Sequence, residues 1–95
     1  MNNNDSLKNI SQAILDFSKT NEIVGFEKYV LDTLKDSKEI ELFNSIWSTT
    51  IDFENWNHSN LQIGFDKTME ILKTKYNLDE QVRIFLTNRA AYEWK

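Results

Sequence analysis

The amino-acid sequence predicts an all-α fold, a small antiparallel bundle of four to five helices. Sheet proteins need turns, and turns favour glycine and proline, yet the 95 residues contain two glycines and no proline. Apolar residues recur at the three- and four-residue spacings of helical stripes. Two capping-box patterns, Asp36 to Glu39 and Asn77 to Glu80, mark expected helix starts.

Five helical segments are expected, each with one apolar stripe. They are residues 6–19, a helix capped by Thr20 or Asn21, a helix capped by Asp36, residues 61–76 and residues 78–94. Residues 49–60 stay open between helix, strand and loop, because β-branched and polar residues lower helix propensity there. Near the end of the chain, Tyr92 and Trp94 are expected to close the core against the first helix, and the alternative is that they add to an exposed aromatic patch.

The length of the chain indicates one domain. Residues 1–5 are expected to be a disordered or frayed start, and residues 6–95 a single helical domain. The absence of cysteine excludes disulfides and thiolate metal sites and suits a reducing cytosol. No run of 18 apolar residues predicts a membrane span, and the Asn-rich start lacks the features of a signal peptide. We therefore expect a cytoplasmic protein without membrane contact.

No catalytic residues, cofactor or metal site are predicted. Nucleophilic triads need a nucleophile beside a base, and the chain has one histidine and no cysteine. The two glycines lie too far apart for a phosphate-binding loop. Asp52, Glu54 and His58 offer three metal ligands, but transition-metal sites usually need more His or Cys. An enzymatic role is therefore not expected.

Direct nucleic-acid binding is not expected either. Residues 67–95 carry a net charge of +2, but acidic residues interrupt basic ones such as Lys67, Lys73 and Arg83. A nucleic-acid interface needs a basic face, whereas the whole chain has a net charge of −4. These bases indicate an ordinary solvated surface.

An acidic segment with aromatic residues is the feature that most suggests a binding role. Residues 39–66 carry five carboxylates and no lysine or arginine. Tryptophan is enriched at interface hot spots, and surrounding carboxylates steer a basic partner. The alternative is that Phe53 and Trp56 only plug one end of the bundle. The candidate partner-binding residues are Glu39, Glu41, Trp47, Asp52, Phe53, Glu54, Trp56, His58 and Asp66.

The length, acidity, helical pattern and acidic-aromatic segment together resemble the small helical immunity proteins that bacteria make against nuclease toxins. These include the partners of colicins and of contact-dependent inhibition toxins. The resemblance is to the class, and no motif residues are carried over from it. It implies a cytosolic protein that binds a basic toxin domain and blocks it.

Two other binding roles remain open. One is an inhibitor or adaptor, such as a phage-encoded anti-defence protein that mimics the charge of nucleic acid, for which a broader acidic face is expected. The other is a homodimerising structural or regulatory module. In that case the aromatic residues are expected to be buried against a second copy.

Overall fold

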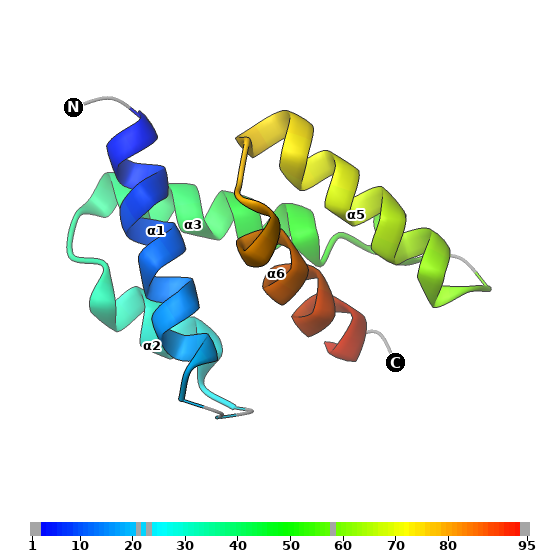
Figure 1. Ribbon diagram of the computed structural model, residues 1–95, viewed down its shortest axis with the longest axis horizontal. Helices are drawn as coiled ribbons and strands as arrows, with labels where there is room; N and C mark the ends of the chain where they lie inside the picture. Colours follow the sequence, from blue (N-terminus) through cyan, green and yellow to red (C-terminus); the bar gives the residue numbers. More distant parts are fainter. Residues whose placement is uncertain (1–2, 21, 23, 58, 94–95) are drawn as a thin grey trace. The chain divides into compact units, whose positions relative to one another are not determined.

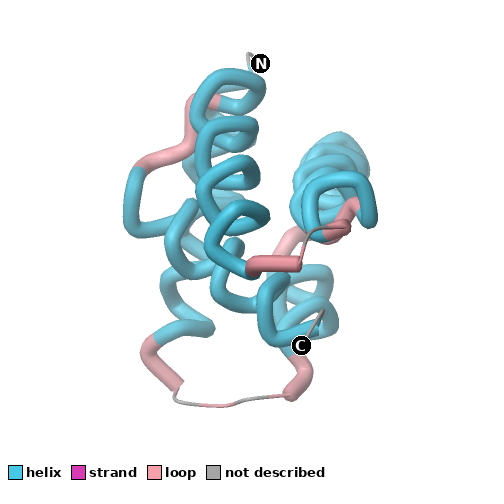
Figure 2. Tube along the Cα trace, turned by 90° about the vertical axis from the view of Figure 1, so that its right-hand side faces the viewer, coloured by secondary structure: helices cyan, strands magenta, loops and turns pink. Residues whose placement is uncertain are grey.

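A computed structural model describes residues 3–20, 22, 24–57 and 59–93. Every regular element in these residues is a helix, which confirms the all-α class (Figure 1, Figure 2). Five helices have eight or more residues, and α4 is a single turn. In chain order they are α1 (Asn3–Ser18), α2 (Phe26–Thr33), α3 (Ser37–Thr50), α4 (Phe53–Trp56), α5 (Leu61–Tyr76) and α6 (Glu80–Glu93).

The chain divides into two compact units, residues 1–44 and residues 45–95. We call them the N-terminal and C-terminal units. Helix α3 supplies its first half to the N-terminal unit and its second half to the C-terminal unit. The single helical domain over residues 6–95 stays a prediction. No helix in the described part of the chain is long and apolar enough to cross a membrane.

Helix α1 begins earlier than the sequence analysis predicted. It includes Asn3 and Asp5. The disordered or frayed start over residues 1–5 stays a prediction, and residues 1 and 2 lie outside the described residues. The carboxylate of Asp5 lies in the first turn. A negative charge there is stabilised by the helix dipole, which favours the longer helix.

The predicted cap of the second helix is also wrong. Helix α2 is capped by Gly25, which has a φ of 85° in the left-handed region that glycine adopts without strain. The Thr20 hydroxyl instead donates to the Phe17 carbonyl and accepts from the Glu22 amide, which closes a turn after α1. The alternative cap, Asn21, lies outside the described residues.

In the N-terminal unit, α2 folds back against α1, and α3 completes the core (Figure 1). The ring of Phe26 packs edge-to-face on Phe17 at 5.4 Å and on Phe43 at 5.9 Å between centroids. One aromatic side chain therefore links all three helices of this unit. The other buried apolar residues are Ile10, Ala13, Ile14, Val30 and Leu34.

The predicted cap of α3 is half right. The Asp36 carboxylate accepts from the Lys38 amide at 2.8 Å, as an N-cap should. The reciprocal bond of a capping box is replaced, because Glu39 accepts from the side chain of Asn9 at 2.6 Å. Glu39 thereby connects α3 to α1.

In the C-terminal unit, α6 folds back against α5 (Figure 1). The second predicted capping box, Asn77 to Glu80, is wrong. Asn77 ends α5 in the left-handed conformation, with φ 54°, and its amide donates to the Leu72 and Lys73 carbonyls. Helix α6 begins only at Glu80. The tight reversal between them lets Leu72, Val82, Leu86 and Ala90 share one core.

The Tyr76 hydroxyl connects α5 to the second half of α3. It hydrogen-bonds with the hydroxyls of Ser45 at 2.8 Å and Thr49 at 3.1 Å. Burial of the phenol raises its pKa, but these hydrogen bonds and the nearby Lys75 ammonium lower it more. The pKa of Tyr76 therefore lies below its ordinary value.

Near the end of α6, Tyr92 is 58% exposed, so its predicted role in closing the core is wrong. Trp94 lies outside the described residues.

Candidate partner-binding site

The segment that the sequence left open, residues 49–60, contains the end of α3, a turn and the single turn α4. The last carbonyls of a helix have no partner within the helix. Here the Asn55 side-chain amide donates to the Thr49 carbonyl at 2.7 Å, and the Trp56 indole donates to the Thr50 carbonyl at 2.8 Å. Side chains of α4 thus satisfy the end of α3 and hold the two helices together.

Asp52 begins α4 as its N-cap. Its carboxylate accepts a hydrogen bond from the Glu54 amide at 2.8 Å, which satisfies one of the free N–H groups of the first turn. Asp52 and Glu54 are both exposed. The cap therefore fixes the Asp52 carboxylate and the backbone at the start of α4, and both carboxylates are open to solvent.

The Trp56 ring packs against α5 at Gly64, where α4 and α5 lie close together. A methyl group on Gly64 would stand 2.6 Å from the Trp56 ring and 2.9 Å from the Asn55 carbonyl oxygen. The indole is 6% exposed. Gly64 is thus required by the close packing of the ring and the α4 backbone on α5.

Three predicted binding residues are buried, contrary to the expectation of exposed anchors and solvated charges. Trp47 and Trp56 are 7% and 6% exposed, and Trp56 follows the alternative in which it fills the core. Its polar nitrogen already has a backbone partner, which removes the cost of burial. Glu39 is 7% exposed and accepts from Asn9. Glu41 is exposed in the N-terminal unit, and His58 lies outside the described residues.

The remaining predicted residues, Asp52, Phe53, Glu54 and Asp66, are exposed around α4 and the start of α5. Phe53 is 54% exposed. The Lys67 ammonium donates to the Glu54 carbonyl at 3.2 Å, which places the outer side of α5 beside α4. The Asp66 carboxylate accepts from the side chain of Gln62 one turn earlier, at 2.8 Å.

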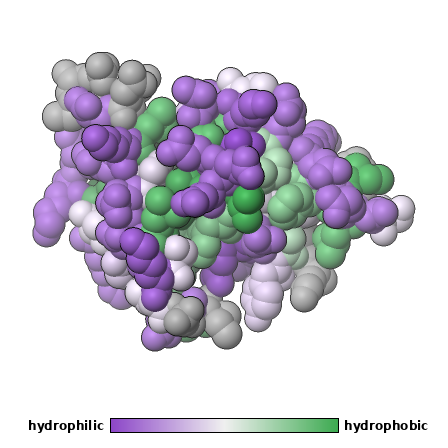
Figure 3. All heavy atoms as spheres, in the orientation of Figure 1, coloured by the Kyte–Doolittle hydropathy of each residue, from purple (hydrophilic) through white to green (hydrophobic). Residues whose placement is uncertain are grey.

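Sequence reasoning missed two apolar residues of this region, Leu61 and Ile63, which are 41% and 49% exposed. Ile63 lies one turn before Lys67 and three residues before Asp66, so it shares their outward side of α5. Figure 3 shows hydrophobic residues exposed over the start of α5, at the right-hand end of the view. The signal for Ile63 was present in the sequence, because it falls outside the inward stripe of Phe65 and Leu72.

We define the α4–α5 surface as the exposed residues Asp52, Phe53, Glu54, Leu61, Ile63, Asp66 and Lys67. It combines three large apolar side chains with three carboxylates and one ammonium group. Such a surface can bury apolar area in a complex while its charges select the partner. The described residues contain no group of three His, Cys, Asp or Glu side chains that would hold a metal ion.

Compared with known proteins, the chain matches no family model, no curated protein and no solved structure.

Replacing Trp56 by alanine should lower the free energy of unfolding by about 3–5 kcal/mol, because it empties a core site and removes the bond to Thr50. Replacing Phe53 by alanine should cost less than about 1 kcal/mol, because that ring is half exposed. Urea unfolding followed by circular dichroism measures both values. Equal losses for the two variants would contradict the inward and outward placement of these rings.

Gly64→Ala tests the packing of α4 on α5 through the sign of its effect. Helix propensity alone predicts a gain of about 1 kcal/mol in the free energy of unfolding, whereas the clash with Trp56 and the Asn55 carbonyl predicts a loss of about 1–3 kcal/mol. Glu70→Ala, at an exposed position of the same helix, is the control. A stabilised Gly64→Ala variant would show that α4 does not approach α5 this closely.

Proposed function

We propose that this chain is a bacterial, cytoplasmic immunity protein that binds a basic, nuclease-type toxin domain and blocks its activity. The observation that carries the proposal is the α4–α5 surface, where Phe53, Leu61 and Ile63 are exposed among carboxylates. The role is one of binding, without catalysis and without a cofactor.

A nuclease toxin needs a basic surface to hold the phosphates of its substrate. Carboxylates of an inhibitor attract that surface at long range and raise the association rate, most strongly at low salt. In the complex, the phenyl ring of Phe53 and the aliphatic side chains of α5 would supply the buried apolar contacts that slow dissociation. The Asp52 cap keeps its own carboxylate and the backbone of α4 in place before the partner arrives, so less order has to be gained on binding.

A second copy of the chain is the other candidate partner. The same exposed apolar residues that suit a toxin would also suit a symmetric dimer. Against this, each copy would bring three carboxylates and one lysine to the interface, and like charges repel. The oligomeric state therefore distinguishes the two roles.

The proposed interface is tested by capture of the tagged chain's partner from lysate of the native host, at moderate and at high salt. A basic protein with nuclease activity should be recovered at one-to-one ratio, and the purified chain should inhibit it.

Neutralising the α4–α5 surface with Asp52→Asn, Glu54→Gln and Asp66→Asn should slow association about tenfold at low salt, with a smaller effect at high salt. Asparagine caps helices as well as aspartate does, so α4 should persist.

Phe53→Ala should mainly raise the dissociation rate, since it removes buried apolar area and no charge. Glu41→Gln, which neutralises an exposed carboxylate outside the α4–α5 surface, is the matched control and should leave the kinetics unchanged. Recovery of the chain alone, together with dimeric mass by sedimentation, would contradict the inhibitor role and favour the homodimer.

A further inference from the structure

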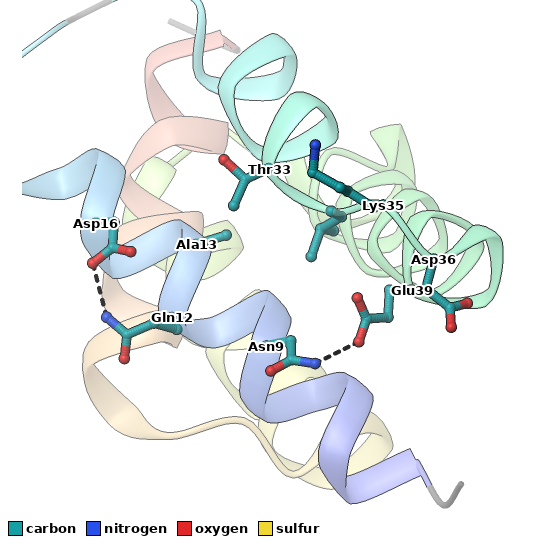
Figure 4. A pocket seen from close by; sticks show the side chains of 9 residues that line it. Asn9, Gln12, Ala13, Asp16, Thr33, Lys35, Asp36 and Glu39 are labelled. Carbon is teal, nitrogen blue, oxygen red and sulfur yellow. Dashed lines mark hydrogen bonds between the residues drawn. The ribbon is translucent and has the colours of Figure 1, made fainter.

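The N-terminal unit contains a pocket between α1 and the connection from α2 to α3 (Figure 4). Its volume is about 430 Å³, which is within the range of pockets that hold small ligands or single side chains. Its lining includes the charged residues Asp16, Lys35, Asp36 and Glu39 and the amide of Asn9. None of them belongs to the α4–α5 surface, so the pocket is a separate feature of the molecule.

The charge of the pocket is negative. Three carboxylates line it, against one ammonium group, that of Lys35. Asp16 accepts from the side chain of Gln12 on its own helix, and Asp36 caps α3. Both are thus engaged in local contacts, which leaves Glu39 as the carboxylate to be explained.

Glu39 is the distinctive residue of the pocket, because it is 7% exposed and yet has no cationic partner among the described residues. One carboxylate oxygen, Oε2, accepts from the Asn9 amide at 2.6 Å. The other oxygen, Oε1, accepts no hydrogen bond from a described residue, and it is not one of the fully buried unpaired atoms, so it keeps contact with solvent at the pocket. Figure 4 shows Asn9 and Glu39 pointing toward one another from the two sides of the pocket.

Buried charges in proteins are normally paired. The position of Glu39 in the first turn of α3 lowers the cost of its burial, since the helix dipole favours a negative charge there. This explains how the unit folds without a cation beside Glu39. The helix dipole does not explain why a cavity with a net negative charge lies beside that carboxylate.

We propose that this pocket receives the guanidinium group of an arginine side chain from a protein partner, with Oε1 of Glu39 as the principal acceptor. Arginine fits better than lysine for two reasons. Its planar group presents several N–H donors and is more weakly hydrated than an ammonium group, and Ala13 and Leu34 offer apolar contact for its methylene stem. That the arginine belongs to a partner protein rests on the proposed function, whereas guanidinium binding itself does not.

Lys35 is the one cationic residue in the pocket lining. It is exposed, its ammonium group points away from Glu39 in Figure 4, and it forms no ion pair with a carboxylate among the described residues. Its charge weakens binding of a second cation in the pocket. Removing that charge should therefore strengthen the binding of arginine.

The test is an NMR titration of the full chain with N-acetylarginine N-methylamide, which resembles an arginine within a polypeptide. We expect saturable shifts of the backbone amides around the pocket and of the Asn9 side-chain amide. The matched citrulline compound, which has the same shape without the charge, should give no saturable shifts. Glu39→Gln should weaken the binding of the arginine compound by at least about tenfold, because it replaces a charged acceptor by a neutral one.

Two variants control for the rest of the unit. Glu41→Gln removes a carboxylate two residues farther along α3, outside the pocket lining, and should leave the affinity unchanged. Lys35→Gln should tighten binding by about twofold or more. The Asn9 amide can still donate to the glutamine oxygen in the Glu39→Gln variant, so the fold should survive, and its unfolding midpoint checks this.

The proposal would be overturned by equal binding of the citrulline compound, by unchanged affinity in Glu39→Gln, or by an absence of saturable shifts in the natural chain. Binding of agmatine but not of the blocked arginine compound would also overturn it, in favour of a free amine. If a toxin is captured and any of these results is also obtained, the arginine-binding role of the pocket is refuted while the proposed function stands. Arginine binding without any captured toxin would refute the proposed function alone.

Discussion

The arrangement of the C-terminal unit depends on the packing of Trp56 against Gly64. A helix of one turn has no stability of its own in water, so α4 exists because its last residue is held in the core. The indole nitrogen satisfies the Thr50 carbonyl at the end of α3, and the ring fills the space that the missing side chain of Gly64 leaves on α5. This contact brings α3, α4 and α5 together, and it sets the backbone from which Phe53 and Glu54 reach solvent.

Much of the fold follows from local sequence patterns. The apolar stripes locate the helices, and the cap at Asp36 marks a true start, because the physical cause of each is contained within one helix. The cap at Asn77 fails for an equally physical reason. Asparagine is favoured both at helix N-caps and in the left-handed conformation that ends helices. The pattern from Asn77 to Glu80 therefore fits two structures, and the packing of α6 against α5 selects the second.

The candidate site is harder to predict from the sequence than the helices are, because the burial of a side chain depends on residues far apart in the chain. Trp56 belongs to no helical stripe, which made it look available for a partner. The residue that buries it, Gly64, lies on a different helix. Glu39 is a similar case, since its buried carboxylate is bonded by Asn9, thirty residues earlier. The fold thus divides the acidic segment of residues 39–66. The carboxylates of Glu39, buried, and Glu41, exposed, lie in the N-terminal unit, and three exposed ones lie around α4 and α5.

The inward position of Trp56 is tested most directly by hydrogen exchange of its indole N–H, followed by NMR and assigned with a Trp56→Phe variant. Because this N–H donates to the Thr50 carbonyl inside the core, its exchange should be slow and should approach the rate set by global unfolding. Exchange as fast as that of a solvent-exposed indole would show that Trp56 is not held in the core. The assignment of Phe53, Leu61 and Ile63 as the exposed apolar surface would then fall with it.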